Sequence, residues 1–359
     1  MLAGVGNEKH EGRNHDMKKC MGYISFIVLL FLFSSCSALS QEEAEASQSS
    51  LFAMNTYMTF TAYGDDAESA LEEAKQQIQE LESLWSVTDT GSEIYAANHS
   101  GGKPVTIGEE TAAVVSFALH MAQQTEGALD PSIYPILTAW GFTTDNKQVP
   151  PADEIQALLQ NVDYSRIHLD GTSLTVPDGM ALDLGAVGKG YAADLVTEVL
   201  KEHGVESALI SLGGNIQAIG SRPDGSDWHI GIQAPWEEGN LGILEISDAG
   251  VVTSGGYENY FEDEEGNKYW HILDPSTGYP ANSGLEAAVI VVSEGKLCDA
   301  LSTALFVMGP DKAETYWREH GNFDMLLVTD KNEIIITEGI ADRFTLNDGR
   351  TETIRVIEE

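Results

Sequence analysis

A carboxylate and a hydroxyl at helical spacing are the first residues in this sequence that could do chemistry. In Cys298-Asp-Ala-Leu-Ser-Thr303, Asp299 and Thr303 are four residues apart, so on a helix their oxygens share one face. Hard oxygen ligands of this kind suit Mg²⁺, which keeps water and substrate phosphate oxygens as its other ligands. The alternative is that Asp299 only caps the N-terminus of that helix.

A glycine-rich turn that enters a helix is the second candidate. It reads Asp183-Leu-Gly-Ala-Val-Gly-Lys-Gly-Tyr-Ala-Ala-Asp194. Glycines let the backbone approach a ligand, the helix N-terminus favours anionic oxygens, and Lys189 can neutralise phosphate. The spacing matches neither the Walker nor the dinucleotide fingerprint, so a purely structural turn remains the alternative.

Two further segments combine turn residues with reactive side chains. Thr253-Ser-Gly-Gly-Tyr257 is followed by Tyr269-Trp-His-Ile-Leu-Asp-Pro-Ser-Thr-Gly-Tyr-Pro280, in which His271 and Asp274 form a possible acid/base pair. The alternative is that His271 has only a structural role, with its ring nitrogens hydrogen-bonded in the core or at the surface. The block from Gly127 to Phe142 contains Asp130-Pro131 and Trp-Gly-Phe, which could equally serve packing.

The segments around these motifs predict a mixture of hairpins and helices. We expect strands at 52–63, 207–212, 228–233, 241–246, 287–292, 325–328 and 333–337, and a hairpin at 167–176. We expect helices at 66–85, 110–125, 153–160, 190–203, 297–308 and 311–320. This order indicates an α+β fold with mixed or antiparallel sheets and packed helices, rather than a regularly alternating parallel sheet.

The composition narrows the class of partner. With 359 residues, 42% of them hydrophobic, the chain can bury an enzyme-sized core. Its 57 acidic and 19 basic residues give a formal charge of -38, which repels phosphate backbones and argues against nucleic-acid binding. A phosphate-rich substrate would therefore need a metal ion or backbone dipoles to offset this field.

The N-terminal residues predict export. Lys18 and Lys19 precede a short apolar run, 21–33, and then Ser34-Ser-Cys36, which resembles a bacterial lipoprotein signal. We expect a signal peptide over 1–35 with Met17 as a plausible true start, a lipidated (palmitate-bearing) Cys36, and a flexible tether over 36–50 before a catalytic domain at 51–359. Anchoring to the outer face of the bacterial cell membrane, or on the periplasmic side, would follow; a non-lipidated signal or an uncleaved anchor is the alternative.

The motifs together resemble the ApbE family of FAD:protein FMN transferases. The resemblance spans about residues 51–345 and rests on six further blocks besides Asp-Ala-Leu-Ser-Thr. These are Met54-Asn-Thr, Gly-Ala-Leu-Asp with Trp-Gly-Phe, the Asp183–Asp194 block, Leu212-Gly-Gly-Asn, Thr-Ser-Gly-Gly-Tyr, and His-Ile-Leu-Asp-Pro-Ser-Thr-Gly-Tyr-Pro. The resemblance implies an ApbE-like, T-fold-related catalytic body.

By motif position, the resemblance also implies particular ligand contacts. The FAD contacts fall on Met54, Ala128, Leu129, Asp130, Asp183, Lys189 and Leu273. The Mg²⁺ ligands fall on the carbonyl of Ala186 and the side chains of Asp299 and Thr303. Where many relatives place a flavin-stacking Tyr, the matching position here is Thr88, so the resemblance implies either weaker stacking on that face of the flavin or stacking by another aromatic residue, such as Tyr57 or Trp85.

The implied activity is Mg²⁺-dependent transfer of the FMN half of FAD to a Thr or Ser hydroxyl of a separate protein, with release of AMP. In this hypothesis His271 deprotonates the acceptor, and Asp274 either orients His271 or acts as the base in its place. The acceptor would carry an Asp-x-x-Ser/Thr-Gly-Ala-Thr/Ser motif in a respiratory or redox subunit. The alternatives are an FAD pyrophosphatase that releases FMN and AMP, and a non-catalytic flavin-binding lipoprotein.

Overall fold

The computed structural model describes residues 45–144 and 146–358. The predicted signal peptide, the predicted lipidation site Cys36 and most of the predicted tether lie outside these residues. Among the described helices, none combines the length and the apolar character that crossing a bilayer requires.

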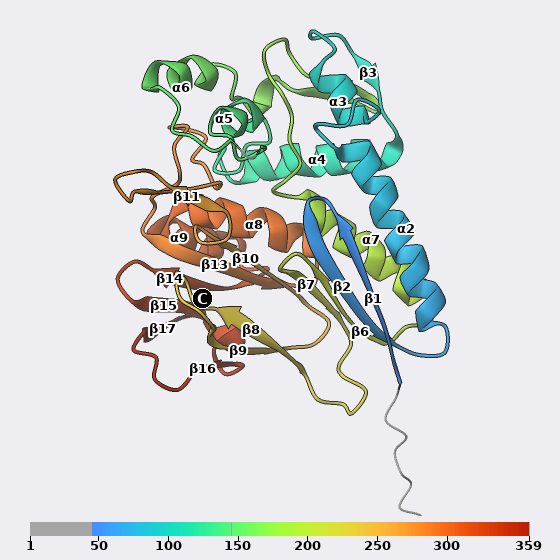
Figure 1. Cartoon of the computed structure of the whole chain (residues 1–359). Coiled ribbons are helices and arrows are strands. Elements are labelled where there is room, and N and C mark those ends of the chain that lie inside the picture. The colour runs from blue at the N-terminus through green and yellow to red at the C-terminus, as the bar shows by residue number, and fades with distance from the viewer. Residues whose placement is uncertain (1–44, 145, 359) are drawn as a thin grey trace, which may run out of the picture. The chain divides into compact units, whose positions relative to one another are not determined.

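The described residues form helices and four sheets (Figure 1). The helices are α2 (Ala67–Trp85), α3 (Glu93–Asn98), α4 (Glu109–Gln124), α5 (Tyr134–Ala139), α6 (Ala152–Leu159), α7 (Gly188–Glu202), α8 (Gly295–Met308), α9 (Pro310–His320) and α10 (Glu338–Ala341), with a 3-10 turn at Tyr164–Arg166. The strands of the largest sheet are β1 (Ala46–Ala53), β2 (Thr56–Tyr63), β6 (Ser207–Leu212), β7 (Asn215–Ile219), β10 (Gly250–Gly255), β13 (Leu285–Val292), β14 (Asp324–Thr329), β15 (Glu333–Thr337) and β17 (Thr353–Ile357).

Three small sheets complete the fold. They are β3 (Val105–Thr106), β5 (Ser173–Thr175) and β4 (His168–Asp170); β16 (Phe344–Leu346), β9 (Asn240–Ile246) and β8 (Trp228–Gln233); and the pair β11 (Tyr260–Glu262) and β12 (Lys268–Trp270). In the nine-stranded sheet every neighbouring pair is antiparallel except β15 and β17, which are parallel. The predicted α+β class is therefore confirmed.

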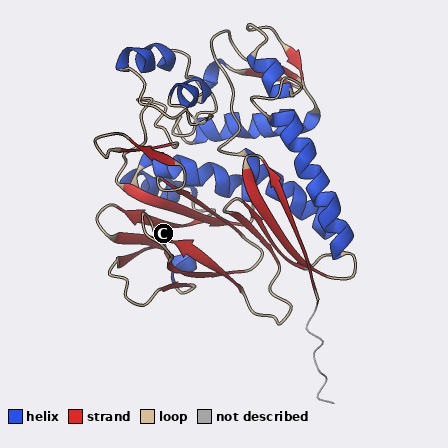
Figure 2. Cartoon of the chain, viewed as in Figure 1, coloured by secondary structure: helices blue, strands red, loops and turns tan. Residues whose placement is uncertain are grey.

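The centre of the large sheet is buried on both faces. Along β13, Ala288 and Ile290 join the core under the helices, whereas Val289 and Val291 join a second core under β8, β9 and β16. This two-sided burial explains why β13 and β14 read as continuous apolar runs rather than alternating ones. Helices α2, α7 and α8 cover one face, and the small β8–β9–β16 sheet covers the other (Figure 2).

The sequence did not predict several of the strands: β3, β7, β10, β11, β12, β16 and β17 were missed, and the single strand expected at 52–63 is the end of β1, a turn and β2. The Ser-rich residues 46–50, assigned to the tether, belong to β1, which pairs with β2 over its whole length from Ala46↔Tyr63 to Ala53↔Thr56. The predicted domain start at residue 51 is therefore too late, because hairpin pairing orders residues that have little apolar character of their own. Among the missed strands, β17 has alternating polar residues at the edge of the sheet, and its pairing with β15 defines it.

Helices α7 and α8 cross with their backbones in close contact. A Cβ atom on Gly190 would lie 2.3 Å from the carbonyl oxygen of Gly295 and 2.6 Å from Cβ of Asp299. No side chain fits between the two helices here, so glycine sets the distance between them.

Replacing Gly190 by alanine should therefore destabilise the protein, although alanine is the better helix former. We expect Gly190→Ala to lower the free energy of unfolding by about 1–3 kcal/mol, because an added methyl would force the helices apart. Gly188→Ala in the same helix is the matched control, since its Cβ would meet Trp85 at 3.8 Å, an ordinary contact. Urea unfolding that gave equal stability for both variants would contradict this view of the crossing.

Candidate active site

Asp299 lies inside α8 and does not cap it. The helix begins at Gly295, and its first amides, those of Gly295 and Lys296, donate to the carboxylate of Asp194 at 2.6 and 3.1 Å. Asp299 is only 4% exposed, and its Oδ2 accepts the Gly190 amide at 2.9 Å. The capping alternative is thus wrong, and the carboxylate faces the start of α7.

Thr303 follows Asp299 by one turn and lies in a cluster of hydroxyls. The Ser254 hydroxyl at the end of β10 is 2.9 Å from Ser302 Oγ and 3.4 Å from Thr303 Oγ1. This contact joins the Thr-Ser-Gly-Gly-Tyr motif to the Asp299/Thr303 face of α8.

The glycine-rich turn meets the same face. Lys189 at the start of α7 places its Nζ 3.9 Å from Oδ1 of Asp299 and 3.3 Å from the Gly185 carbonyl oxygen, to which it donates. Within the turn, Asp183 Oδ1 accepts the Gly185 amide at 2.8 Å. Burial raises the pKa of Asp183, and the positive charge of Lys189 partly offsets that rise.

The Gly127–Phe142 block is tied to this turn through its backbone. The amide of Asp183 donates to the Pro131 carbonyl at 2.7 Å. Asp130 is 8% exposed: Oδ1 accepts the amide and hydroxyl of Ser132 at 2.8 and 2.6 Å, and Oδ2 accepts the Tyr164 amide at 3.1 Å. Its carboxylate therefore shapes the loop that carries Ala128 and Leu129.

His271 lies beside the loop that follows β10. Its Nδ1 is 3.3 Å from the carbonyl oxygen of Asn259. Burial lowers the pKa of His271 to about 4, and the charge of Lys189 lowers it further, while the contact with Asn259 acts in the opposite direction. The imidazole is therefore neutral at physiological pH.

Asp274 does not orient His271 in this structure. Its Oδ1 accepts the amide and hydroxyl of Ser276 at 2.8 and 2.7 Å, so it organises the Asp-Pro-Ser-Thr-Gly turn. That turn is joined to α5 because Trp140 Nε1 donates to the Gly278 carbonyl at 2.8 Å, while Leu273 is buried in the small core beneath. The partner of His271 is a backbone carbonyl, which has no signature in the sequence.

Glu258 is a residue of this region that the motifs did not reveal. Loss of hydration among the surrounding atoms raises the pKa of Glu258 to about 7, although its side chain keeps contact with solvent. Lys189 lowers this pKa and Asp299 raises it, which places all three groups within electrostatic reach of one another. Only the tertiary fold distinguishes Glu258 from the chain's many surface acids.

The residues expected to contact FAD differ in how accessible their side chains are. Met54 lies in the tight turn between β1 and β2, with φ of 49°, and its amide donates to Glu82 Oε1 at 2.7 Å. Trp85 is 6% exposed and packs edge-on against Tyr191, so it is a core residue and the expectation that it stacks on the flavin is wrong. Tyr57 on β2 is 62% exposed and remains accessible.

The donor set at Asp299 fits a single hard cation. The described residues contain no group of three or more His, Cys, Asp or Glu side chains placed to hold a metal. One buried carboxylate, the Thr303 hydroxyl and the turn that carries the Ala186 carbonyl leave positions for water and phosphate oxygens, as Mg²⁺ requires.

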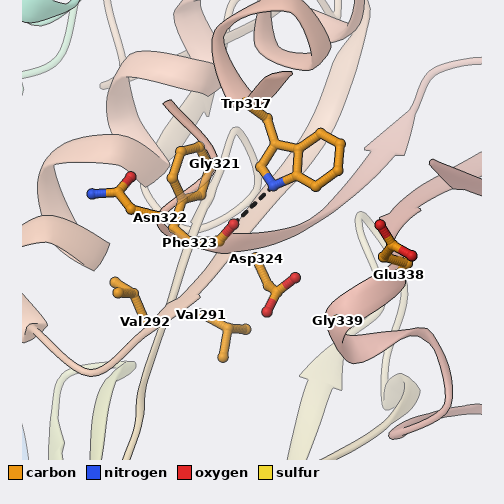
Figure 3. A pocket seen from close by; sticks show the side chains of 9 residues that line it. All are labelled: Val291, Val292, Trp317, Gly321, Asn322, Phe323, Asp324, Glu338 and Gly339. Carbon is orange, nitrogen blue, oxygen red and sulfur yellow. Dashed lines mark hydrogen bonds between the residues drawn. The ribbon is translucent and has the colours of Figure 1, made fainter. Parts of the chain in front are cut away.

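A cavity of about 400 Å³ lies elsewhere and lacks these groups. Its walls come from β13, α9, β14 and α10, and Trp317 Nε1 donates across it to the Phe323 carbonyl at 2.8 Å (Figure 3). Asp324 beside it accepts the Thr337 hydroxyl at 2.7 Å. None of the predicted site residues lines this cavity.

Comparison with known proteins agrees with this arrangement. Residues 54–327 match the sequence profile of the ApbE family. The chain belongs to the ApbE family. It is 34% identical over 304 residues to the FAD:protein FMN transferase of Treponema pallidum, covering 79% of this chain and 84% of that protein, and 33% identical over 285 residues to one from Klebsiella pneumoniae, covering 78% and 88%.

Solved ApbE structures have the same fold. The ApbE protein of Thermotoga maritima superposes with a TM-score of 0.75 at 30% identity, covering 85% of this chain and 97% of that one. The flavinyl transferase ApbE of Pseudomonas stutzeri, in its apo form, gives 0.72 at 29% identity, covering 81% and 93%.

Removing the Asp130 carboxylate should loosen the loop that carries the predicted FAD contacts. We expect Asp130→Ala to cost about 1–3 kcal/mol of stability, because buried donors on Ser132 and Tyr164 lose their acceptor. Asp224→Ala is the matched control: Asp224 makes the same turn with Ser226, at 3.0 and 2.6 Å, but in solvent. Thermal unfolding should show a larger loss of stability in Asp130→Ala than in Asp224→Ala. An equal loss in both variants would show that the buried turn contributes no more to stability than the exposed one.

Proposed function

We propose that this chain transfers the FMN half of FAD to a Thr or Ser hydroxyl of another protein. The observation that carries the proposal is the contact of the Asp183–Lys189 turn with the Asp299/Thr303 face of α8. It joins a glycine-rich turn, a helix N-terminus and one lysine at a place suited to a pyrophosphate. The names of the relatives support the same activity.

The reaction exchanges a phosphoanhydride bond for a phosphoester bond. The acceptor oxygen bonds to the FMN-side phosphorus, the bond from that phosphorus to the bridging oxygen breaks, and AMP leaves with that oxygen. The hydroxyl proton passes to a base. Because phosphoryl transfer depends mainly on positioning and charge stabilisation, the residues that hold the phosphates determine most of the rate.

His271 is the base in this proposal. Its Nδ1–H donates to the Asn259 carbonyl, so Nε2 keeps the free lone pair that can accept the acceptor's proton. Lys189 Nζ is 3.9 Å from Asp299 Oδ1, so in this proposal it meets the phosphate oxygens beside the metal site.

We also propose Mg²⁺ as the cofactor, held by Asp299, Thr303 and the Ala186 carbonyl. When bound, Mg²⁺ would offset negative charge on the phosphate oxygens. The amide of Gly190 holds one oxygen of Asp299, which leaves the other directed toward Lys189 and the turn.

The place of action is part of the proposal. The lipoprotein-like residues 18–36 support export and lipid anchoring through Cys36 at the outer face of the cell membrane. An acceptor there would be a respiratory or redox subunit with an Asp-x-x-Ser/Thr-Gly-Ala-Thr/Ser motif.

Substitutions at Asp299 test the metal site. We expect Asp299→Asn to keep the hydrogen bond with Gly190 but to slow transfer at least about a hundredfold, because the charge on the ligand is gone. Thr303→Val should also slow transfer, and Thr303→Ser, which restores the hydroxyl, should recover most of it. In-gel flavin fluorescence of an acceptor peptide over a Mg²⁺ titration measures transfer, and free FMN reports hydrolysis. Full transfer by Asp299→Asn at the wild-type Mg²⁺ requirement would exclude this metal site.

The pH dependence tests His271 as base. A base works when it is neutral, so kcat/KM should rise with pH through the His271 pKa of about 4 and level off above it. In Lys189→Met the loss of a nearby positive charge should raise this pKa and move the limb to higher pH. In His271→Ala the rise of kcat/KM with pH should vanish together with most of the rate. A wild-type limb that survives in His271→Ala would assign it to another group.

A further inference from the structure

A groove of about 270 Å³ adjoins the active site and has no role in the chemistry described above. Its aromatic walls are Trp236, from the turn between β8 and β9, and Trp270, at the end of β12. Gly256 and Phe306 line it as well, together with Asn282, Gly284, Leu285, Lys268, Glu286 and Asp330.

The groove is continuous with the reacting groups along three segments. Gly256 comes two residues after Ser254, which contacts Thr303, and Trp270 directly precedes His271. Phe306 lies three residues beyond Thr303 in α8, about 4.5 Å further along the helix axis. A chain seated in the groove would therefore have its neighbouring residues beside His271.

The groove is held open by specific contacts. A Cβ on Gly256 would lie 3.0 Å from Trp270 and 3.3 Å from Trp236, so a side chain here would crowd both indoles. Trp236 has a φ of 59° and donates through Nε1 to Glu286. The Nε1 of Trp270 and the hydroxyl of Tyr257 are buried and have no hydrogen-bond partner among the described residues.

Two lysines lie at the rim although the chain is strongly acidic. Lys268 Nζ is 4.0 Å from the centre of the Trp236 ring and 5.5 Å from that of Tyr260. Lys147 Nζ donates to the side chain of Asn259, at 2.5 Å, and to the Tyr260 carbonyl, at 3.3 Å. Lys268 is also 4.0 Å from Glu262, and Glu286 and Asp330 line the groove, so the rim is positive on the side of Lys147, for which the described residues provide no ion pair. Beside Tyr260, which is 37% exposed, this side suits a partner segment that has an apolar side chain and a carboxylate.

We propose that this groove seats the segment of the acceptor protein that flanks the modified hydroxyl, with an apolar side chain against Trp236 and Trp270 and a carboxylate near Lys147. This docking site rests on the proposed transfer function, since a hydrolase would need no polypeptide there. It gives the enzyme a means of choosing one hydroxyl among many, because specificity comes from contacts beside the reacting atom.

The test uses the described enzyme and a synthetic peptide with the sequence pattern Asp-x-x-Ser-Gly-Ala-Thr. Adding the peptide should slow hydrogen exchange of the amides in residues 256–270. Lys147→Glu should raise the KM for the peptide about tenfold while the KM for FAD stays at the wild-type value. Lys312→Glu, the same charge change at an exposed position of α9, should leave both constants unchanged.

Two results would overturn the proposed docking site. Protection of amides elsewhere, or an unchanged peptide KM in Lys147→Glu, would place the acceptor on another surface. If residues 256–270 become protected in the absence of peptide as the enzyme concentration rises, a second copy of the chain occupies the groove instead. If the peptide protects the groove but FAD is only hydrolysed, the transfer function fails and the docking site stands.

Discussion

The approach of α7 to α8 is the constraint on which the active site depends. Because Gly190 and Gly295 bring the two backbones together, the Asp299 carboxylate reaches the first amides of α7. The partial positive charge of that helix end stabilises the carboxylate, and the carboxylate in turn occupies an amide that would otherwise lack a partner. The turn before α7 is placed by the same contact.

Three further links extend this arrangement to the other motifs. The Asp183 amide fixes the turn to Pro131, Trp140 fixes that block to Gly278, and Ser254 meets Thr303. Each link joins segments that are distant in sequence, and two of them use a backbone carbonyl as the acceptor. The motifs are thus held together largely through backbone groups, and few hydrogen bonds join a side chain of one motif to a side chain of another.

This mode of assembly explains what could be predicted from the sequence. The residue types and local spacing of Asp299 and Thr303, and the glycines before α7, were sufficient to indicate their chemistry. Most helices and the strands β6, β13 and β14 follow from their apolar patterns, whereas β7 and β10, at the centre of the large sheet, were not predicted. The partner of His271 and the position of Glu258 could not be predicted, because a carbonyl oxygen has no residue type and a single acid among 57 has no distinguishing neighbours in sequence. The strand β1 was missed for a related reason, since its order comes from pairing with β2 rather than from burial of its Ser-rich residues.

The charge distribution around Lys189 shows how so acidic a chain can accept an anionic substrate. Lys189 lies within electrostatic reach of Asp183, Glu258, Asp299 and His271. Burial raises the pKa of Asp183, and the charge of Lys189 opposes that rise. Glu258 is exposed, so water screens its charge. The charge of Lys189 and a cation at Asp299 would therefore offset the formal charge of -38 locally, which would favour phosphate binding. One lysine beside a cation site, rather than an excess of basic residues, is what would make this surface compatible with a pyrophosphate.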